Sequence, residues 1–238
     1  VAVSADGRRV LLGAPHYGCW GLDDALVCGE AQLFERGPDG WQLRHAFRSP
    51  DPLAVGSTFG IAVALSADGK LVAVGGEGSP EGGSGAVHLY EEREGRFDLL
   101  ARLGPERAGE RLFGGVVAMT PDGSLVAIGA DSRVELWALG KDALTAVAEL
   151  GPPEADAGFF GASLALDARG RHLLVGAPGS PCADGDTFCG RAYLYGRATP
   201  DGRWRLVRRL DPPQPVPRAS FGRRLALVSD GTLLAVEG

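Results

Sequence analysis

The chain has few of the residues on which several kinds of function depend. Its 238 residues include four cysteines and four histidines, and Lys70 and Lys141 are the only lysines among 24 basic side chains. The net charge of −6 gives no electrostatic reason to expect binding to nucleic acid or to an anionic membrane. No apolar run approaches the roughly 20 residues that a membrane-spanning helix needs. Nucleic-acid-binding proteins and helical membrane proteins are therefore disfavoured classes.

The first residue is Val1, in the middle of a repeat, and no segment of this sequence resembles a signal peptide. We therefore expect the chain to be a fragment or a processed segment of a longer protein. The missing targeting sequence then says little about its compartment.

The four cysteines form two short-range pairs at equivalent places. Each pair follows a Gly-Ala-Pro sequence and ends in Cys-Gly just before an apolar run. This pattern predicts two loop-clamping disulfides, Cys19–Cys28 and Cys182–Cys189. It also predicts an extracellular or cell-surface location or, alternatively, an oxidising organelle lumen. Four free, buried thiols are the competing interpretation, whereas a zinc site is disfavoured because the spacings do not match Cys-x2-Cys.

A spacing of ten residues from Phe-Gly to a later Gly recurs four times without a gap. The pairs are Phe59/Gly69, Phe113/Gly123, Phe160/Gly170 and Phe221/Gly231. Val1–Gly13 carries the rest of the same unit. Self-similarity of this length indicates a repeat architecture.

Each repeat reads as four strands. The first, such as Phe59–Leu65, alternates large and small apolar residues with no polar face, which predicts a strand packed on both sides. An Asp-Gly hairpin turn such as Asp68-Gly69 follows. The fourth, such as Phe97–Leu103, alternates apolar and polar residues, as an outer strand should. These patterns predict an all-β fold, a β-propeller of four-stranded antiparallel blades, with a β-sandwich as the alternative.

We expect residues 1–238 to form a single β-propeller. Its repeats are predicted at residues 1–58, 59–112, 113–159 and 160–220, with a partial fifth repeat at 221–238. The first repeat already supplies four strands of its own, so it cannot simply complete the last. Four full repeats and a partial fifth therefore predict part of a larger propeller. An unusual ring closed by the two extra strands is the alternative.

The sequence Phe160-Gly161, followed by Gly176-Ala177-Pro178, resembles the FG-GAP repeat of integrin-α-type β-propellers. The resemblance covers essentially the whole chain, although the second repeat has Gly75-Gly76 and the last has Glu237 in the glycine position. It implies an extracellular propeller of up to seven blades. WD40 repeats are the nearest competitor, because Thr120–Ile128 suits such a blade. However, no repeat has the Gly-His start, and the periods are long.

The FG-GAP family binds calcium in a loop between the first two strands, through several Asp or Asn oxygens. The corresponding loops here, Ser4–Gly7 and Ser66–Gly69, have one carboxylate each. We therefore expect no metal and no cofactor. Asp184 and Asp186 could offer two carboxylates, but a solvated turn is favoured.

No catalytic set is evident. The histidines occupy unrelated positions, and His45, His88 and His172 fall on predicted strands, which favours surface or packing roles. We predict that the chain is not an enzyme but a non-catalytic, extracytoplasmic propeller, acting as a protein- or glycan-interaction module or as a structural subunit of a larger assembly. The alternative is an accessory propeller of a hydrolase or lyase whose catalytic domain lies outside this segment.

The predicted binding face is the end of the meander that carries the cysteine-clamped loops and the proline-rich crossovers. Rigid loops on a stable scaffold are common binding sites. The expected partner is a protein or a glycan, within a large assembly in one variant, with neither nucleic acid nor a membrane span involved. The candidate contact residues are Tyr17, Trp20, Asp23, Asp24, Asp184, Asp186 and Phe188. Stabilisation of long loops is the alternative role of the disulfides.

Overall fold

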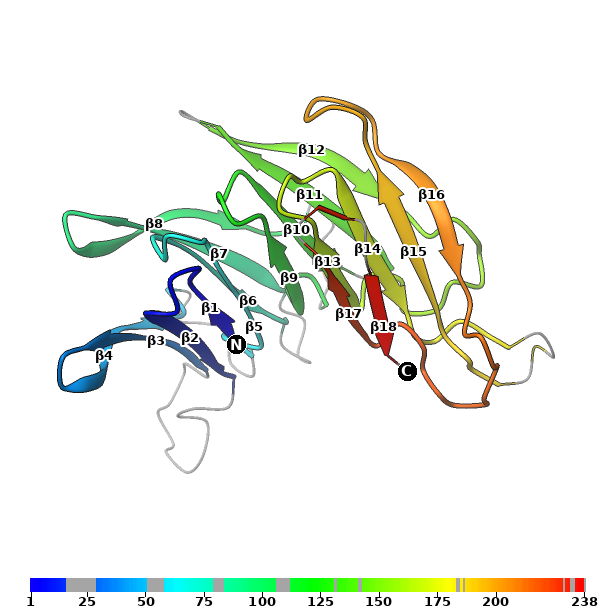
Figure 1. The fold of residues 1–238 in the computed structure, drawn as a ribbon, viewed down its shortest axis with the longest axis horizontal. Coiled ribbons are helices and arrows are strands. Elements are labelled where there is room, and N and C mark those ends of the chain that lie inside the picture. Colours follow the sequence, from blue (N-terminus) through cyan, green and yellow to red (C-terminus); the bar gives the residue numbers. More distant parts are fainter. Residues whose placement is uncertain are drawn as a thin grey trace. The chain divides into compact units, whose positions relative to one another are not determined.

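The computed structural model describes residues 1–15, 29–50, 58–78, 84–105, 112–130, 132–140, 143–182, 185, 187–228, 230–231 and 234–237. Within these ranges every regular element is a β-strand, and no helix is long and apolar enough to cross a membrane. The chain divides into two compact units, Val1–Ser124 and Leu125–Gly238. The strands are labelled in Figure 1.

The first unit contains two four-stranded antiparallel sheets, each a meander in chain order. Their strands are β1 (Ala2–Val3), β2 (Arg9–Ala14), β3 (Glu30–Gly37) and β4 (Gly40–Arg48), then β5 (Ala62–Leu65), β6 (Leu71–Gly76), β7 (Ala86–Arg93) and β8 (Arg96–Leu103). A further strand, β9 (Val116–Met119), lies against β5 and β6.

The second unit repeats the pattern. It begins with an antiparallel run of β10 (Leu125–Ala130), β11 (Arg133–Leu139) and β12 (Leu144–Leu150). A complete four-stranded meander follows, with β13 (Ser163–Leu166), β14 (His172–Ala177), β15 (Arg191–Gly196) and β16 (Arg205–Leu210). The hairpin of β17 (Arg224–Leu227) and β18 (Leu234–Glu237) ends the unit. The predicted all-β fold with repeated four-stranded antiparallel sheets is thus confirmed.

In three repeats, the turn between the first and second strands contains the same hydrogen bond, from a hydroxyl to a carboxylate. The hydroxyl of Ser4 donates to Oδ1 of Asp6 at 2.6 Å, and the same oxygen accepts the amide of Arg8 at 2.9 Å. Gly7 then takes a φ of +65°, a conformation that suits glycine. The Asp-Gly hairpins predicted from the sequence are therefore confirmed. The same hydroxyl–carboxylate pair recurs in Ser66/Asp68 and Thr120/Asp122.

The repeat motif has two parts, the Phe-Gly turn before the first strand and a glycine in the second strand. The second-strand glycine of one repeat contacts the Phe-Gly turn of the next. A Cβ atom on Gly13, in the second strand of the first repeat, would overlap the carbonyl oxygen of Gly60, in the Phe-Gly turn of the second. Glycine is needed here because the two backbones are in direct contact. The same overlap recurs in the pairs Gly75/Gly114 and Gly176/Gly222.

Burial along the sheets differs from the sequence-based expectation. The second strand β6 is buried along its whole length, whereas β5 is mostly half-buried and Ile61, in the turn before it, is 40% exposed. The reason is that β6 has hydrogen-bonded neighbours, β5 and β7, on both edges, whereas β5 is the first strand of its sheet. The prediction that the first strand is packed on both sides is therefore wrong, and the second strand takes that place. Phe47, Tyr90 and Phe97 pack together in the core of this unit, with ring centroids about 5 Å apart.

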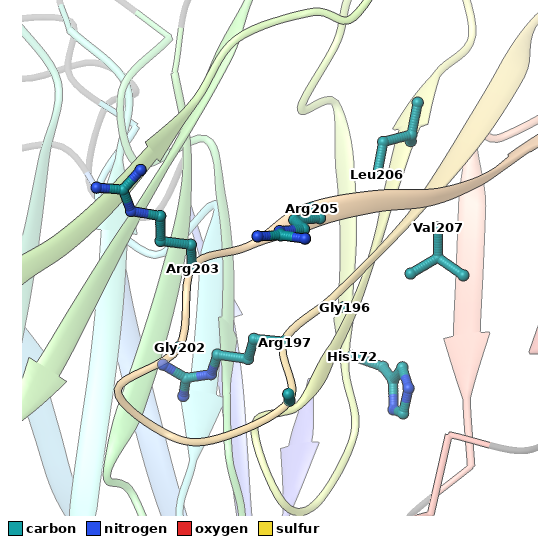
Figure 2. Close-up of a pocket in the computed structure, with 9 residues that line it drawn as sticks. His172, Gly196, Arg197, Gly202, Arg203, Arg205, Leu206 and Val207 are labelled. Atoms are coloured by element: carbon teal, nitrogen blue, oxygen red, sulfur yellow. The ribbon is translucent and has the colours of Figure 1, made fainter.

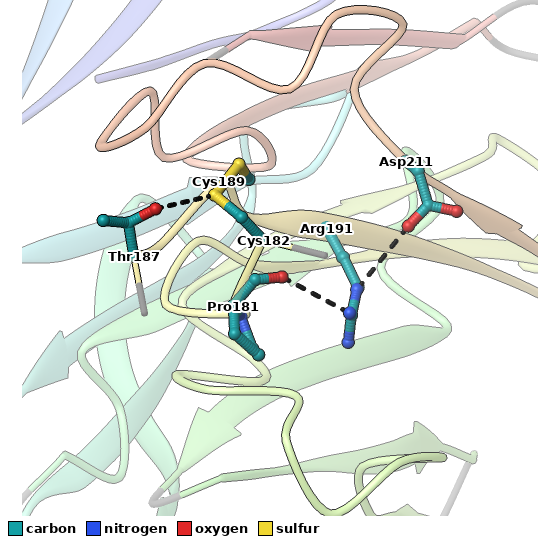
Figure 3. The surroundings of a disulfide bond; sticks show 6 residues. All are labelled: Pro181, Cys182, Thr187, Cys189, Arg191 and Asp211. Carbon is teal, nitrogen blue, oxygen red and sulfur yellow. Dashed lines mark hydrogen bonds and ion pairs between the residues drawn. A yellow bond between two sulfur atoms is a disulfide. The ribbon is translucent and has the colours of Figure 1, made fainter. Parts of the chain in front are cut away.

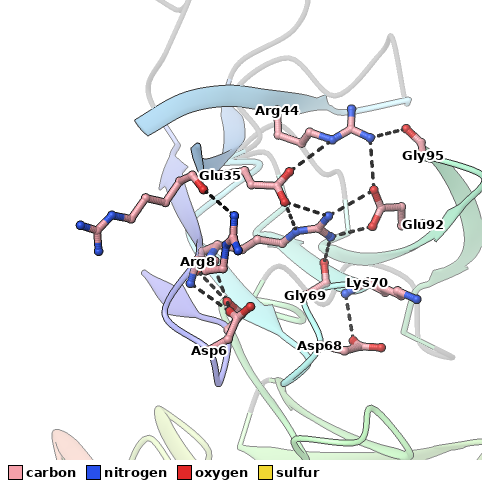
Figure 4. A network of polar contacts seen from close by, with 12 residues as sticks. Asp6, Arg8, Glu35, Arg44, Asp68, Gly69, Lys70, Glu92 and Gly95 are labelled. Carbon is pink, nitrogen blue, oxygen red and sulfur yellow. Dashed lines mark hydrogen bonds and ion pairs between the residues drawn. The ribbon is translucent and has the colours of Figure 1, made fainter. Parts of the chain in front are cut away.

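An ion-pair network joins the two sheets of the first unit (Figure 4). Arg9 on β2 contacts Glu92 on β7 at 2.6 Å and Glu35 on β3 at 3.4 Å, and it donates to the carbonyl of Gly69 at 3.0 Å. Arg44 on β4 reaches Glu92 at 3.2 Å and Glu35 at 3.6 Å. Burial raises the pKa of the Glu92 carboxyl, but the two guanidinium groups lower it by more, so the net pKa lies below its ordinary value.

Candidate functional site

The Cys182–Cys189 disulfide predicted from the sequence is present, with an S–S distance of 1.97 Å and a Cα–Cα distance of 4.9 Å. It favours an oxidising compartment, outside the cytoplasm. Phe188 lies within the clamped loop and is 57% exposed, so its ring is accessible. The other cysteine pair and the remaining predicted contacts lie outside the described residues: Cys19, Cys28, Tyr17, Trp20, Asp23, Asp24, Asp184 and Asp186.

The disulfide lies beside a cluster of ion pairs centred on Arg191 (Figure 3). The guanidinium of Arg191 donates to the carbonyl of Pro181 at 3.3 Å and contacts Asp211 at 3.5 Å. It also contacts Glu154 and Asp156, each at 3.0 Å. These partners surround Arg191 with carboxylates and a carbonyl. The cluster is therefore best explained as structural bracing of the loop.

The turn of the fourth repeat breaks the pattern of the earlier turns. Asp167 stands where those repeats have Ser or Thr, and Arg169 stands where they have Asp. Oδ1 of Asp167 accepts the amides of Arg171 at 2.7 Å and His172 at 3.0 Å, so it closes the turn alone. Oδ2 lies 2.9 Å from Nδ1 of His172. The side chain of Asp167 is 1% exposed, so a buried carboxyl group lies against the imidazole.

The imidazole of His172 borders an open hollow of about 660 Å³ (Figure 2). This volume falls in the range of roughly 300–1,000 Å³ that is common for small-molecule sites. His172 pairs in register with Gly196, and Gly196 pairs with Arg205, so these three residues form one row across β14, β15 and β16. A Cβ atom on the middle residue would meet Cγ2 of Val207 on β16 at 2.9 Å and Cδ2 of His172 at 3.6 Å, so the valine and the imidazole both pack over Gly196. Gly231 lies against the ring, since a Cβ atom there would overlap it.

Three arginines line the same hollow: Arg197, Arg203 and Arg205. The Nε of Arg197 donates to the carbonyl of Gly170 at 2.7 Å, and its Nη1 donates to the carbonyl of Pro200. Its guanidinium carbon lies 4.8 Å from the ring centroid of Trp204, which is a cation–π distance. The arginine is therefore held in one orientation by two carbonyls and one aromatic face.

This arrangement suits general base catalysis. In the tautomer with the proton on Nδ1, the ring donates to Oδ2 of Asp167 and Nε2 is the nitrogen that can accept a proton. The nine described residues that line the hollow include no Ser, Thr or Cys. In the described part of the chain, no three His, Cys, Asp or Glu side chains gather in a way that could hold a metal ion.

Similar solved structures support the fold. No protein-family model matches the chain, and no curated protein matches its sequence. The chain is similar to a candidate 6-phosphogluconolactonase from Bacteroides uniformis, with a TM-score of 0.60 and 13% identity over 99% of this chain and 76% of that one. It is also similar to the β-propeller domain of Cps50 (Swd1) from Myceliophteria thermophila, with a TM-score of 0.58 and 14% identity over 99% and 77%. These likenesses identify the fold as that of β-propellers.

Two further solved structures are similar to this chain. The periplasmic gluconolactonase PpgL of Pseudomonas aeruginosa matches with a TM-score of 0.50 and 16% identity over 99% of this chain and 76% of that one. A protein from Lactobacillus plantarum matches with a TM-score of 0.55 and 19% identity over 87% of this chain. The chain spans 57% of the length of that protein.

The comparisons correct the predicted function. The predictions of a non-catalytic interaction module or structural subunit, and of a chain that is not an enzyme, are overturned, because similar structures carry the names of lactonases. His172 was expected to have a surface or packing role, because the four histidines occupy unrelated positions in the sequence. The Asp167–His172 pair lies at the turn between β13 and β14. The sequence signal for it was the loss of the Ser/Thr-x-Asp-Gly pattern at Asp167–Gly170.

Proposed function

We propose that this chain is the β-propeller part of a hydrolase that cleaves a carboxylic ester or a lactone, and that its hollow beside His172 is the reaction site. One observation carries the proposal. Oδ2 of the buried Asp167 lies 2.9 Å from Nδ1 of His172, and His172 borders an open hollow. Similarity to structures named as lactonases supports the same reaction class.

In the proposed reaction, Nε2 of His172 takes a proton from water as the water oxygen attacks the carbonyl carbon. Asp167 stabilises the resulting imidazolium and keeps the ring oriented. The new C–O bond forms, the carbonyl electrons move to oxygen, and their return expels the alkoxide. The imidazolium then gives its proton to that alkoxide, so the base is regenerated. A positioned general base of this kind contributes roughly 10²–10⁴-fold to the rate.

The setting of this site is proposed on separate grounds. We propose a single propeller with repeats at 1–58, 59–112, 113–159, 160–220 and 221–238, belonging to a larger ring of the FG-GAP type. The paired halves of the glycine motif support the repeat boundaries, because the second-strand glycine of one repeat contacts the next repeat's Phe-Gly turn.

We also propose an extracellular or cell-surface location, with Cys19–Cys28 as a second disulfide and a protein or glycan partner at the clamped loops. The observed disulfide supports that location.

The test is hydrolysis of neutral sugar δ-lactones and of p-nitrophenyl esters by the full chain and three variants. We expect His172→Gln to lower kcat by about 10²–10⁴-fold, because the base is lost. Asp167→Asn should lower kcat and alter the pH profile, because the ring loses its anionic partner. Arg169→Gln, an exposed change in the same turn, should match the parent chain. A folded parent chain without activity, or a His172→Gln variant as active as the parent, would refute the proposal.

A further inference from the structure

We propose that the outer face of the sheet β1–β4, opposite the face that β5–β8 covers, is a docking surface for a second copy of this chain. The two copies would pack the same face against each other around a two-fold axis. This inference is independent of the proposed reaction, because none of the described residues of this face lines the hollow beside His172.

The outer face carries large apolar side chains on all four strands of this sheet, which is drawn in blue in Figure 1. The strand register joins four of them into one row: Val3, Val10, Phe34 and Leu43. Leu12 and Trp41 lie on the same face, each two residues along its strand from a member of that row. Val3, Trp41 and Leu43 are each about half exposed, and Leu12 is more than a third exposed. Exposed apolar side chains that gather in this way, rather than singly, mark interaction surfaces.

The second repeat shows what residues at these positions do. The turns at Gly7 and Gly69 align the two repeats, and the strand register gives the equivalent positions. Five positions of the outer face correspond to residues through which β5–β8 packs against β1–β4: Leu65, Val72, Val74, Tyr90 and Phe97. All but Leu65 are buried there. The fold therefore uses these positions to pack one sheet against another, whereas their counterparts in β1–β4 are exposed or half-buried.

A second copy matches this face in both shape and charge. The inner face of β1–β4 already packs against β5–β8 through residues such as Leu11 and Phe47, so the outer face is the one that this sheet has free in each copy. The charged residues of the outer face lie at the two ends of β3. Arg36 is at one end, and the ion pair between Glu30 and Arg48, at 2.9 Å, is at the other. The centre that two copies would bring together is therefore apolar, as the core of a protein interface is.

The size of the face sets the expected strength of the contact. The strand β3 is 8 residues long. With a rise of about 3.3 Å per residue and strands about 4.8 Å apart, a four-stranded face of this length covers roughly 500 Å². Two such faces would bury roughly 1,000 Å² in total, which is at the lower limit for a specific protein interface. We therefore expect a reversible dimer with a dissociation constant in the micromolar range.

The experiment is sedimentation velocity of the full chain at concentrations from below to above the micromolar range. Leu43→Glu should raise the dissociation constant of the dimer at least about tenfold, because each dimer would bury two unpaired carboxylates. Leu99→Glu is the matched control and should dimerise as the parent chain does. Leu99 has the same position in the second repeat and is 46% exposed, against 53% for Leu43. Trp41→Glu, a second change on the outer face, should act as Leu43→Glu does.

A cross-linking measurement tests the two-fold arrangement. Under mild oxidation, Leu43→Cys should link two copies through the new cysteines, whereas Leu99→Cys should not. A chain that stays monomeric at every concentration overturns the proposal, including the case in which another part of the same chain covers the face. Equal effects of Leu43→Glu and Leu99→Glu overturn it as well, because the contact would then lie elsewhere. Oligomers that keep growing with concentration also overturn it, because a head-to-tail contact does not close as a two-fold contact does.

Discussion

At Asp167 and Arg169, two changes in a repeated turn alter its side-chain contacts. In the first turn Ser4 and Asp6 act together, because Oδ1 of Asp6 accepts both the hydroxyl of Ser4 and the amide of Arg8. Asp167 closes the fourth turn with one oxygen, which leaves the other oxygen for the imidazole of His172. The Asp167–His172 pair therefore arises at a structural position of the repeat, and the scaffold is preserved because the backbone amides keep a partner.

The glycine pairs give a prediction at the same scale. Gly75→Ala should destabilise the chain by about 3 kcal/mol, because its Cβ atom would overlap the backbone carbonyl of Gly114, which cannot move as a side chain can. Thermal unfolding measures the effect. Gly37→Ala is the matched control, since the added atom would meet only the carbonyl of Gly40 at 3.8 Å and should cost little. Equal melting temperatures for the two variants would contradict the packing argument.

Among the elements, the loop between β14 and β15 is braced by both a covalent and an ionic contact. The disulfide closes residues 182–189, and the cluster around Arg191 ties the start of β15 to Pro181 and Asp211. Amide hydrogen bonds add to this, from Cys189 to the carbonyl of Ser180 at 3.0 Å and from Arg218 to that of Phe188 at 2.6 Å. The loop is thus well constrained, although its tip carries an exposed aromatic ring.

Removing the disulfide should lower stability by about 2–3 kcal/mol, because the unfolded chain regains the freedom of an eight-residue loop. The double variant Cys182→Ser/Cys189→Ser is compared with the parent chain by denaturant unfolding. Parent chain treated with a reductant should approach the value of the variant. An unchanged unfolding midpoint in the double variant would show that the ionic cluster alone braces the loop.

For the whole molecule, paired carboxylates link stability to pH. The hydroxyl of Ser4 lowers the pKa of Asp6. Burial raises the pKa of Asp68, but the hydroxyl of Ser66 and the amide of Lys70 lower it by more, below the ordinary value of 3.8. The same balance lowers the pKa of Asp122 and Glu92. Carboxyls with a depressed folded-state pKa stabilise the fold above their unfolded pKa and lose that contribution as the pH falls through the folded pKa.

We therefore expect nearly constant stability from about pH 7 to 5 and a steady loss below about pH 4.5, where these groups begin to protonate in the unfolded chain. Unfolding midpoints measured from pH 7 to pH 3 would show this profile. Asp68→Asn should differ from the parent chain more at pH 7 than at pH 3, because only the ionised carboxylate receives the hydrogen bonds in full strength. A difference that grows toward pH 3 would contradict the assignment.

Much of the fold followed from local sequence patterns. The Asp-Gly turns at Gly7 and Gly69, the strands between them and the Cys182–Cys189 pair were all predicted, because each depends on residues close together in the chain. Period-two alternation and positive-φ glycines are local properties, and so is a disulfide over eight residues. The sequence by itself therefore determined an all-β repeat scaffold with a braced loop.

Only the tertiary structure brought the candidate site together. His172, Gly196 and Arg205 lie on three different strands, and their common row depends on the register, including the irregularity between Leu194 and Tyr195 that shifts β16. The burial of Asp167 and the hollow that His172 borders also depend on that packing. Alternation along one strand specifies which face a side chain takes, but not which residue of the next strand it will meet. That is why the repeat could be predicted from the sequence, whereas the candidate site could not.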